Sequence, residues 1–477
     1  MDLLSERAGL ANANASAYAW NREFFDRQLQ KYSTENKAAV GAVASGTDLI
    51  KAFLSAPGEI DTFLGPRTYQ ILELEPFCAG CSMDILESGS DPRVTKPIAL
   101  LDDRCRRMHH SEPPGGYKRP DLGALSATQL LRELRKWRYS CPNEADAARR
   151  LLYVVNPDCW AIMALAATAS AFQVAFLAEF FYKYLGSRTS LGIHRPVRGP
   201  LIFGLEFHLQ FYVWREGDEH FRDPRKKRNG TPLRQSRKLV HLKMSEENEA
   251  PVNIYEVQVS CLITGTDEDS WVAHQFVDTY YQGVTSLEQE EQNPVKPDPL
   301  TAGLYDANLP IWSPRELEPH TQGYEDFASP SDEGATSSMA QKQSKQQVLN
   351  EANMFLQQTI HCISKVIEVW DRFNRRDLNY IQDILRSDSK KSPIPPFKVV
   401  TMIEDHVDAL KDLQRRAEEQ KDLCAALARK LEMQIVMEDN EATARQQAGN
   451  EMIKYWTGIG LVSIPFSPMT SLKSDQS

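Results

Sequence analysis

The last third of the chain constrains the fold most, because its apolar residues recur at helical spacing through two long stretches. Residues 347–385 carry an apolar stripe covering about one-third of a helix circumference, which predicts one long packed helix. The stripe consists of Leu349, Phe355, Leu356, Thr359, Ile360, Ile363, Ile367, Trp370 and Phe373. The proline-rich segment 392–396 interrupts this pattern, and a second helix is predicted over residues 398–455.

The second helix has an apolar seam whose spacing alternates near three and four residues, as in a coiled coil. The seam consists of Ile403, Val407, Leu410, Ala417, Cys424, Leu431 and Ile435. Polar Gln414 and Lys421 fall on the same seam, which argues against a regular two-stranded zipper. We therefore expect a long antiparallel helical hairpin or an oligomeric stalk.

The first part of the chain mixes helical and strand patterns. Residues 13–53 contain helix-compatible stretches such as 20–32, whereas the alternation at 69–75 (YQILELE) predicts a half-buried strand. Ser126 precedes apolar residues at helical spacing and marks a helix start. Residues 151–155 (LLYVV) predict a short buried strand. These features favour a mixed α and β domain.

Residues 159–178 form an uncharged run of twenty residues, long enough to span a bilayer. Eight of the twenty are alanine, which adds little insertion energy, and three polar residues interrupt the run. Asp158 and Glu179 close it without a one-sided basic flank. A buried helix of a soluble core is therefore favoured over a membrane-spanning helix.

Three segments, 201–215, 252–263 and 271–281, show strand patterns. The first places Leu205, Phe207, Leu209 and Phe211 on one face and Glu206, His208, Gln210 and Tyr212 on the other. Turn residues at 265–267 (GTD) separate the last two segments. We expect an antiparallel meander that completes an α+β domain near residue 284.

Residues 285–345 lack the apolar material for a packed core and predict a disordered linker. They contain seven prolines, and residues 281–340 hold eleven Asp and Glu against two Lys and Arg. This excess accounts for most of the formal net charge of −10, so the rest of the chain is near neutral. Composition therefore indicates neither nucleic-acid binding nor attraction to anionic lipid.

The two ends of the chain suggest where it resides. Residues 1–11 have no apolar signal region, so we expect a cytoplasmic protein. Residues 455–472 are uncharged but include two prolines and two glycines and are slightly too few to span a bilayer. The expected domains are an α+β domain (1–284), an acidic linker (285–345), an all-α hairpin or stalk (346–454) and a truncated membrane-type segment with tail (455–477).

Cys78 and Cys81 have the spacing of half a zinc site, and Cys105 with His109 or His110 would supply further ligands. The second half lacks this spacing, and one CxxC pair alone is a weak signal. A redox pair is disfavoured because no thioredoxin-like context surrounds it. We assign no metal ligands and expect the eight cysteines to be mostly buried thiols in a reducing compartment.

The basic segment 222–238, here called the basic loop, holds eight Lys and Arg against one acidic residue. It lies between two predicted strands, so we interpret it as a solvated loop. Binding of anionic lipid headgroups and nuclear import are the alternatives. Aromatic residues do not alternate with the basic ones, and we expect no nucleic-acid partner.

Sequence motifs of common enzymes are absent: we find no phosphate-binding loop, dinucleotide fingerprint, nucleophile elbow or HExxH. His208 and His220 lie near Glu206 and Glu219, but this spacing does not define a base and its nucleophile. We therefore predict no catalytic residues, no bound cofactor and no enzymatic activity.

Seven segments carry a family resemblance: 156–158 (NPD), 164–170 (ALAATAS), 203–209 (FGLEFHL), 212–215 (YVWR), 255–265 (YEVQVSCLITG), 271–273 (WVA) and 276–280 (FVDTY). Together they resemble the CorA-like magnesium transporters, in particular divergent filamentous-fungal members. In that family a stalk helix leads into the first membrane helix, and residues 464–472 (IPFSPMTSL) look like its first part.

The sequence departs from the family after Leu472, where neither Gly-Met-Asn nor a second membrane helix follows. The resemblance thus implies a non-conducting CorA-like protein, with magnesium only as the family's cation. Its expected role is assembly or regulation through the stalk, with itself or with a complete CorA-like paralogue, and membrane association at the C-terminus. One alternative is a magnesium or other divalent cation transporter whose C-terminal coding sequence is incomplete. Another is a soluble intracellular adaptor.

Overall fold

The computed structural model describes residues 46–54, 68–105, 119, 122–136, 138, 146–170, 173–194, 203–239, 251–265, 270–283, 339–378 and 396–462. They belong to two compact units. The first, here the sheet unit, joins residues 1–328 to 358–417, and the second, here the distal unit, joins 329–357 to 418–477. The part of the predicted hairpin that lies in 358–417 thus packs with the α+β residues. The predicted segments 20–32, 285–338 and 463–477 lie outside the described residues.

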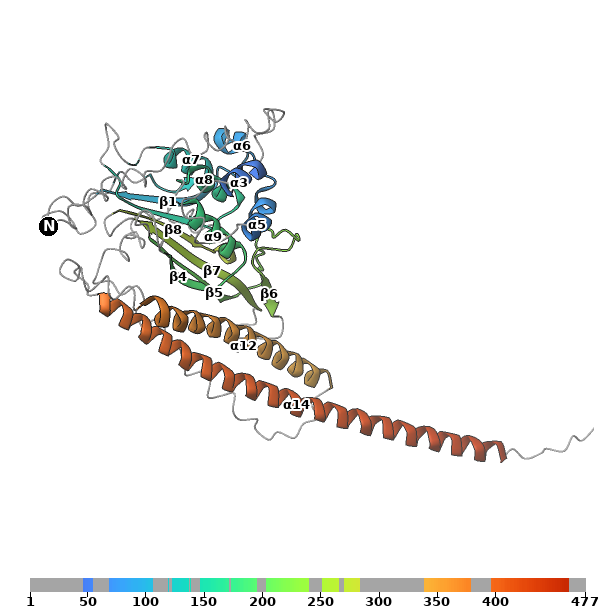
Figure 1. Cartoon of the computed structure of the whole chain (residues 1–477). Helices are drawn as coiled ribbons and strands as arrows, with labels where there is room; N and C mark the ends of the chain where they lie inside the picture. The colour runs from blue at the N-terminus through green and yellow to red at the C-terminus, as the bar shows by residue number, and fades with distance from the viewer. Residues whose placement is uncertain are drawn as a thin grey trace, which may run out of the picture. The chain divides into compact units, whose positions relative to one another are not determined.

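One mixed sheet forms the centre of the sheet unit (Figure 1). Its described strands are β1 (Pro97–Arg104), β2 (Leu125–Ser126), β3 (Arg149–Val155), β4 (Ser190–His194), β5 (Phe203–Glu216), β6 (Ser236–Leu239), β7 (Val252–Gly265) and β8 (Trp271–Val277). Their order is β2-β1-β3-β8-β7-β5-β4, with β6 paired to β7. Among these strands only β3 and β8 pair in parallel.

The expected antiparallel meander is confirmed. β5 pairs with β7 from Phe203 opposite Gly265 to Glu216 opposite Val252, and β7 pairs with β8. The predicted strand at 151–155 is also confirmed, as β3. An α+β fold with a long C-terminal helix is therefore established for the described residues.

The predicted strand at 69–75 is wrong: these residues belong to helix α5 (Thr68–Cys78). A short alternating run also contains apolar residues at helical spacing, and here Leu74 and Cys78, four residues apart, are both fully buried. Tertiary packing of that face outweighs the two-residue alternation.

The uncharged run at 159–178 forms two buried helices in place of the single one expected, α8 (Cys159–Thr168) and α9 (Val174–Leu185). The break lies at Ala169, which is extended. The Ser170 hydroxyl donates to Gln173 Oε1 at 2.9 Å, which closes the turn into α9. Among the described helices, none combines the length and apolar character needed to cross a membrane. The prediction that residues 159–178 contribute to a buried core is thus confirmed.

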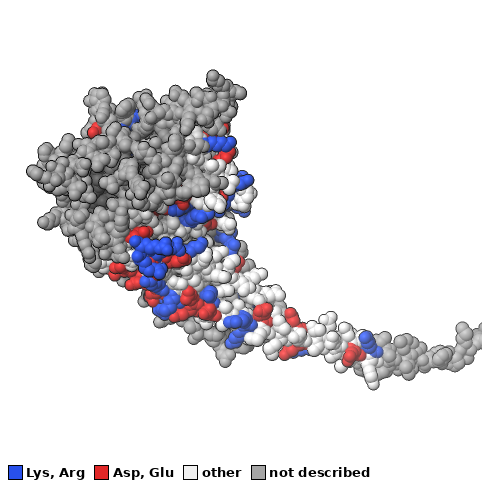
Figure 2. Space-filling model, viewed as in Figure 1, with Lys and Arg blue, Asp and Glu red and all other residues white. Residues whose placement is uncertain are grey.

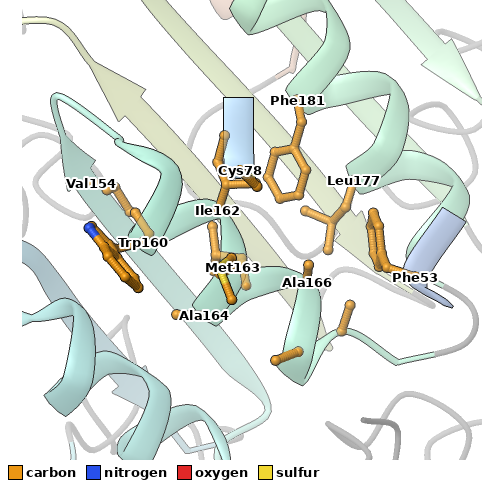
Figure 3. Packing of buried hydrophobic residues seen from close by; sticks show 14 of the residues in the cluster. Phe53, Cys78, Val154, Trp160, Ile162, Met163, Ala164, Ala166, Leu177 and Phe181 are labelled. Carbon is orange, nitrogen blue, oxygen red and sulfur yellow. The ribbon is translucent and has the colours of Figure 1, made fainter. Parts of the chain in front are cut away.

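Helices α8 and α9 form the main hydrophobic core, where Phe53, Cys78, Ile162, Met163 and Phe181 cluster (Figure 3). The neighbouring helices are α3 (Gly46–Leu54), α5, α6 (Met83–Ser88) and α7 (Ala127–Leu134).

The start of α7 agrees with its sequence signal. Ser126 accepts a hydrogen bond from the Gln129 amide, and Gln129 Oε1 accepts one from the Ser126 amide. This reciprocal capping box satisfies amide donors that would otherwise lack partners at the helix start.

Two further helices follow in the last third of the chain. They are α12 (Met339–Phe373), which continues into the π-helix η5 (Asn374–Leu378), and α14 (Pro396–Val462). Within the sheet unit Trp370, Phe373 and Val407 cluster with Leu191 and Ile193 of β4. These β4 residues alternate with those facing α9, so α9 and the α12–α14 pair cover opposite faces of the sheet.

A close approach of α9 to β5 generates our first prediction. A Cβ atom at Gly204 would lie 2.5 Å from Phe176 Cε1 and 2.7 Å from Cδ1. Gly204→Ala should therefore lower the free energy of unfolding by about 1–3 kcal/mol, the usual cost of overpacking a core. Urea denaturation measures this loss.

The matched control is Gly80→Ala, where a Cβ would meet nothing within 4 Å. It should leave the denaturation midpoint almost unchanged. Adding Phe176→Leu to Gly204→Ala should recover part of the loss, and equal midpoints for both glycine variants would contradict the close approach.

Candidate functional site

A buried carboxylate just after β8 organises a network of charged side chains. Asp278 is 2% exposed, and its Oδ1 accepts a hydrogen bond from Arg225 Nη2 at 2.8 Å. Its Oδ2 accepts from Arg234 Nε at 2.6 Å and from the Gln258 amide at 3.0 Å. The Tyr184 hydroxyl also donates to Oδ1. Burial tends to raise the pKa of Asp278, but Arg225 and Arg234 outweigh it and hold this pKa below its usual range.

Both arginines belong to the basic loop and are buried, which corrects our interpretation of this segment as a solvated loop. Arg225 also makes a two-point contact with Asp223, from Nε at 2.8 Å and from Nη2 at 2.7 Å. Arg234 donates to Ser187 Oγ at 2.8 Å and to the Tyr184 carbonyl at 2.9 Å. The sequence shows that this segment is basic, but it does not show which arginines form ion pairs with buried carboxylates. The buried ion pairs of Arg225 and Arg234 were therefore not predicted.

The remaining basic side chains of this loop do face solvent. Exposed are Arg222, Lys226, Arg228, Arg237 and Lys238, whereas Lys227 is half-buried. The basic loop is thus held by two internal arginines and presents the rest outward. Lipid binding and nuclear import remain predictions for this outer surface.

A second polar cluster lies between α9 and the β4–β5 edge. Glu206 is 2% exposed and contacts the Lys183 ammonium and His194 Nε2, the latter at 3.0 Å. His208 Nε2 lies 3.8 Å from Glu206 Oε2. Burial tends to raise the pKa of Glu206, but His194, His208 and Lys183 outweigh it and hold this pKa far below its usual range. The polar face of β5 is thus the buried one here.

The buried polar side chains include the three residue types of a catalytic triad, with Ser260 as nucleophile, His208 as base and Glu206 as orienting carboxylate. Ser260 Oγ lies 2.8 Å from His208 Nδ1. However, Ser260 and His208 are both 0% exposed, and the 3.8 Å separation of His208 from Glu206 is too long for a hydrogen bond. The arrangement therefore ties β5 to β7 and offers no surface nucleophile. His220 lies away from this cluster, beside Tyr255.

The two cysteines of the predicted half-site are joined by a third that the sequence did not indicate. Cys78 Sγ lies 3.9 Å from the Cys159 carbonyl oxygen, and the Cys81 side chain hydrogen-bonds to Cys159. Cys105 follows β1, and His109 and His110 lie outside the described residues. Across the described part of the chain, no group of His, Cys, Asp or Glu side chains is arranged to hold a metal ion.

Helices α12 and α14 contact each other in both units. In the sheet unit Gln414 Nε2 donates to Ser364 Oγ at 3.1 Å, and in the distal unit Lys342 pairs with Glu438. Within the sheet unit α14 residue numbers fall from Gln414 to Val407 as α12 numbers rise from Ser364 to Trp370, so the helices run antiparallel there. Charged side chains are interspersed with uncharged ones along the described helices (Figure 2).

The α14 seam has the predicted period but is poorly covered in the distal unit. Lys421, Cys424, Leu431 and Ile435 are only half-buried, and no hydrophobic side chain in the described part of this unit is fully buried. Beside the seam a stripe of apolar residues is exposed. This flank stripe consists of Leu423 (52%), Leu427 (45%) and Met437 (64%).

Comparison with known proteins gives no match to any family model, any curated protein or any solved structure.

The Asp278 network generates our second prediction. Asp278→Asn keeps the shape of the side chain but leaves two buried guanidiniums without their shared carboxylate. Stability should fall by about 3–5 kcal/mol, the usual cost of breaking a buried ion pair from one side. Thermal or urea unfolding of the full chain measures the loss.

Asp408→Asn is the control, because the Asp408 side chain is 74% exposed where it pairs with Lys411. This variant should unfold much like the unmodified chain, since solvent screens exposed ion pairs. A similar loss for both variants would show that Asp278 has no special role.

The buried histidines generate a third prediction. Burial lowers the pKa of His274 to about 3, and it also lowers the pKa of His208. Below about pH 6.5 the unfolded chain binds protons that the folded chain does not, so stability should fall as pH decreases from about 6.5 to 5. Each such histidine contributes at most about 1.4 kcal/mol per pH unit.

His274→Leu should flatten this slope, measured as urea unfolding free energy against pH. The control is His361→Leu at an exposed position of α12. It should leave the slope unchanged. If the slope of unfolding free energy against pH were identical after His274→Leu, this histidine would not be the source of the pH dependence.

Proposed function

We propose that this chain is a CorA-like transporter-domain protein that assembles with itself through residues 418–455, here called the assembly segment. The incomplete burial of this segment carries the proposal. It lies on one continuous helix, yet its seam residues are only half-buried against α12. A helix of this length is stabilised mainly by packing of its apolar face, so a further helix is needed to cover the seam and the flank stripe.

The position of the exposed residues favours another copy of the same helix. Leu423, Leu427 and Met437 lie at spacings of four and ten residues, which places them on one side of α14 next to the seam. Two adjacent apolar stripes on one helix suit a bundle of more than two helices. The α12–α14 pair supplies two, and a second copy would supply the others.

The polar seam residues fit the same assembly. Gln414 is satisfied by Ser364, and Lys421 is half-buried beside Cys424. Polar residues at seam positions lower stability but fix register and partner number. They would therefore select one assembly geometry over loose hydrophobic association.

The family part of the proposal rests on the sequence resemblance together with the architecture. A mixed sheet with helices on both faces, followed by a 67-residue helix, suits a cytosolic domain joined to a stalk. The antiparallel α12–α14 contacts support a helical hairpin as the base of that stalk. The association with magnesium rests only on the sequence resemblance, because the described residues supply no metal site.

Light scattering of the full chain tests the assembly, and this is our fourth prediction. The unmodified protein should have a mass that is a multiple of the 54.1 kDa chain. Leu423→Glu with Leu427→Glu should shift it toward the monomer, because burying two carboxylates in the interface costs several kcal/mol. Circular dichroism should show that the sheet unit remains folded.

The matched control places two glutamates on the opposite side of the same segment, Asn440→Glu with Gln447→Glu, where both positions are exposed. This variant should keep the oligomeric mass. A strictly monomeric unmodified chain at high concentration would overturn the assembly, and a stable complex only with a different chain would point to a paralogue as the partner.

A further inference from the structure

Three thiols from separate parts of the sequence meet at one corner of the sheet unit. Cys78 is the last residue of α5, Cys81 follows three residues later, and Cys159 is the first residue of α8. Cys78 and Cys81 belong to the main core, and Cys159 packs against it. The fold therefore brings a third sulfur to the CxxC pair across a separation of 78 residues (159 minus 81).

The three sulfurs differ in their surroundings. Burial raises the pKa of Cys78, and hydrogen bonding to Cys159, followed by burial, raises that of Cys81. Cys159 is more exposed than either and lies in the first turn of α8, where helix amides favour an anion. The Arg93 guanidinium interacts electrostatically with both Cys159 and Cys81. Cys159 is thus the thiol of the three that an oxidant in solution reaches most readily.

We propose that Cys159 is a peroxide-reactive thiol that closes a disulfide with Cys81. The packing of the two side chains carries the inference: Cys81 lies in the main core, Cys159 packs against that core, and the two side chains are hydrogen-bonded. A sulfenic acid formed at Cys159 would therefore lie next to its resolving thiol. Cys78 is less suited as the partner, since its Sγ contacts the carbonyl oxygen of Cys159.

The chemistry balances with a hydroperoxide as the oxidant. The Cys159 thiolate attacks one oxygen of hydrogen peroxide, the O–O bond breaks, and the departing hydroxide takes a proton to become water. The Cys81 sulfur then attacks the sulfur of the sulfenic acid, loses its proton and expels hydroxide, which leaves as a second water. Two thiols and one peroxide give one disulfide and two waters.

The disulfide would link the α5–α6 turn to the start of α8. These two segments are already in contact, so the oxidised chain keeps the fold and gains a cross-link between distant parts of the sequence. The oxidised form should therefore unfold at a higher temperature than the reduced form, and dithiothreitol should reverse the shift.

Mass spectrometry of the folded full chain tests the proposal and is our fifth prediction. After brief treatment with hydrogen peroxide, alkylation and digestion, the expected product is a Cys81–Cys159 linked peptide with loss of both alkylatable thiols. In Cys81→Ser, Cys159 should stop at the sulfenic acid and react with dimedone. In Cys159→Ser, Cys81 should remain a thiol.

Cys261 and Cys362 provide an internal control, because they too are buried and have raised pKa values, but neither has a sulfur neighbour in the described residues. Both should remain alkylatable after unfolding. Conversion of Cys159 to sulfinic acid without a linked peptide in the unmodified chain would overturn the proposal, as would preferential linkage of Cys159 to another cysteine. The unmodified chain alone decides this, so a poorly folded variant leaves the test intact.

Discussion

The shared carboxylate of Asp278 is the constraint on which the sheet unit depends most. A single buried carboxylate cannot compensate two guanidiniums, and Asp223 supplies the second negative charge through its two-point contact with Arg225. Two arginines and two aspartates thus balance inside the protein, where an unpaired charge would be prohibitive. The network joins the end of β8, the end of α9 and the basic loop, so these elements must fold as one.

The same principle explains why a polar face of β5 can be buried. Glu206 and His208 would be costly beneath α9 if they stood alone, but Lys183 and His194 compensate the carboxylate and Ser260 binds the imidazole. The apolar face of this edge is then free to receive α12 and α14. Burying polar residues on one side and apolar residues on the other allows one sheet edge to be covered on both faces.

Local patterns in the sequence predicted elements well where one interaction decides the structure, as at the capping box of Ser126 and the meander of β5, β7 and β8. They failed where tertiary packing decides. Residues 69–75 fit both the two-residue period of a strand and the helical period. The neighbouring sequence does not show that Leu74 and Cys78 face the core. The contact of Cys159 with Cys81, and the burial of Arg225, depend on segments distant in sequence. The spacing of residues along the sequence carries no information about contacts between such distant segments.

The contrast between the two units bears on how α14 is stabilised. In the sheet unit Val407 and Ala417 are buried, so this part of the helix is fixed by the core. In the distal unit no described hydrophobic side chain is fully buried, although the heptad spacing continues through Leu431 and Ile435. Intrinsic helix propensity alone is a weak source of stability. The periodic pattern in the distal unit therefore supports the proposed assembly with a further copy of the chain.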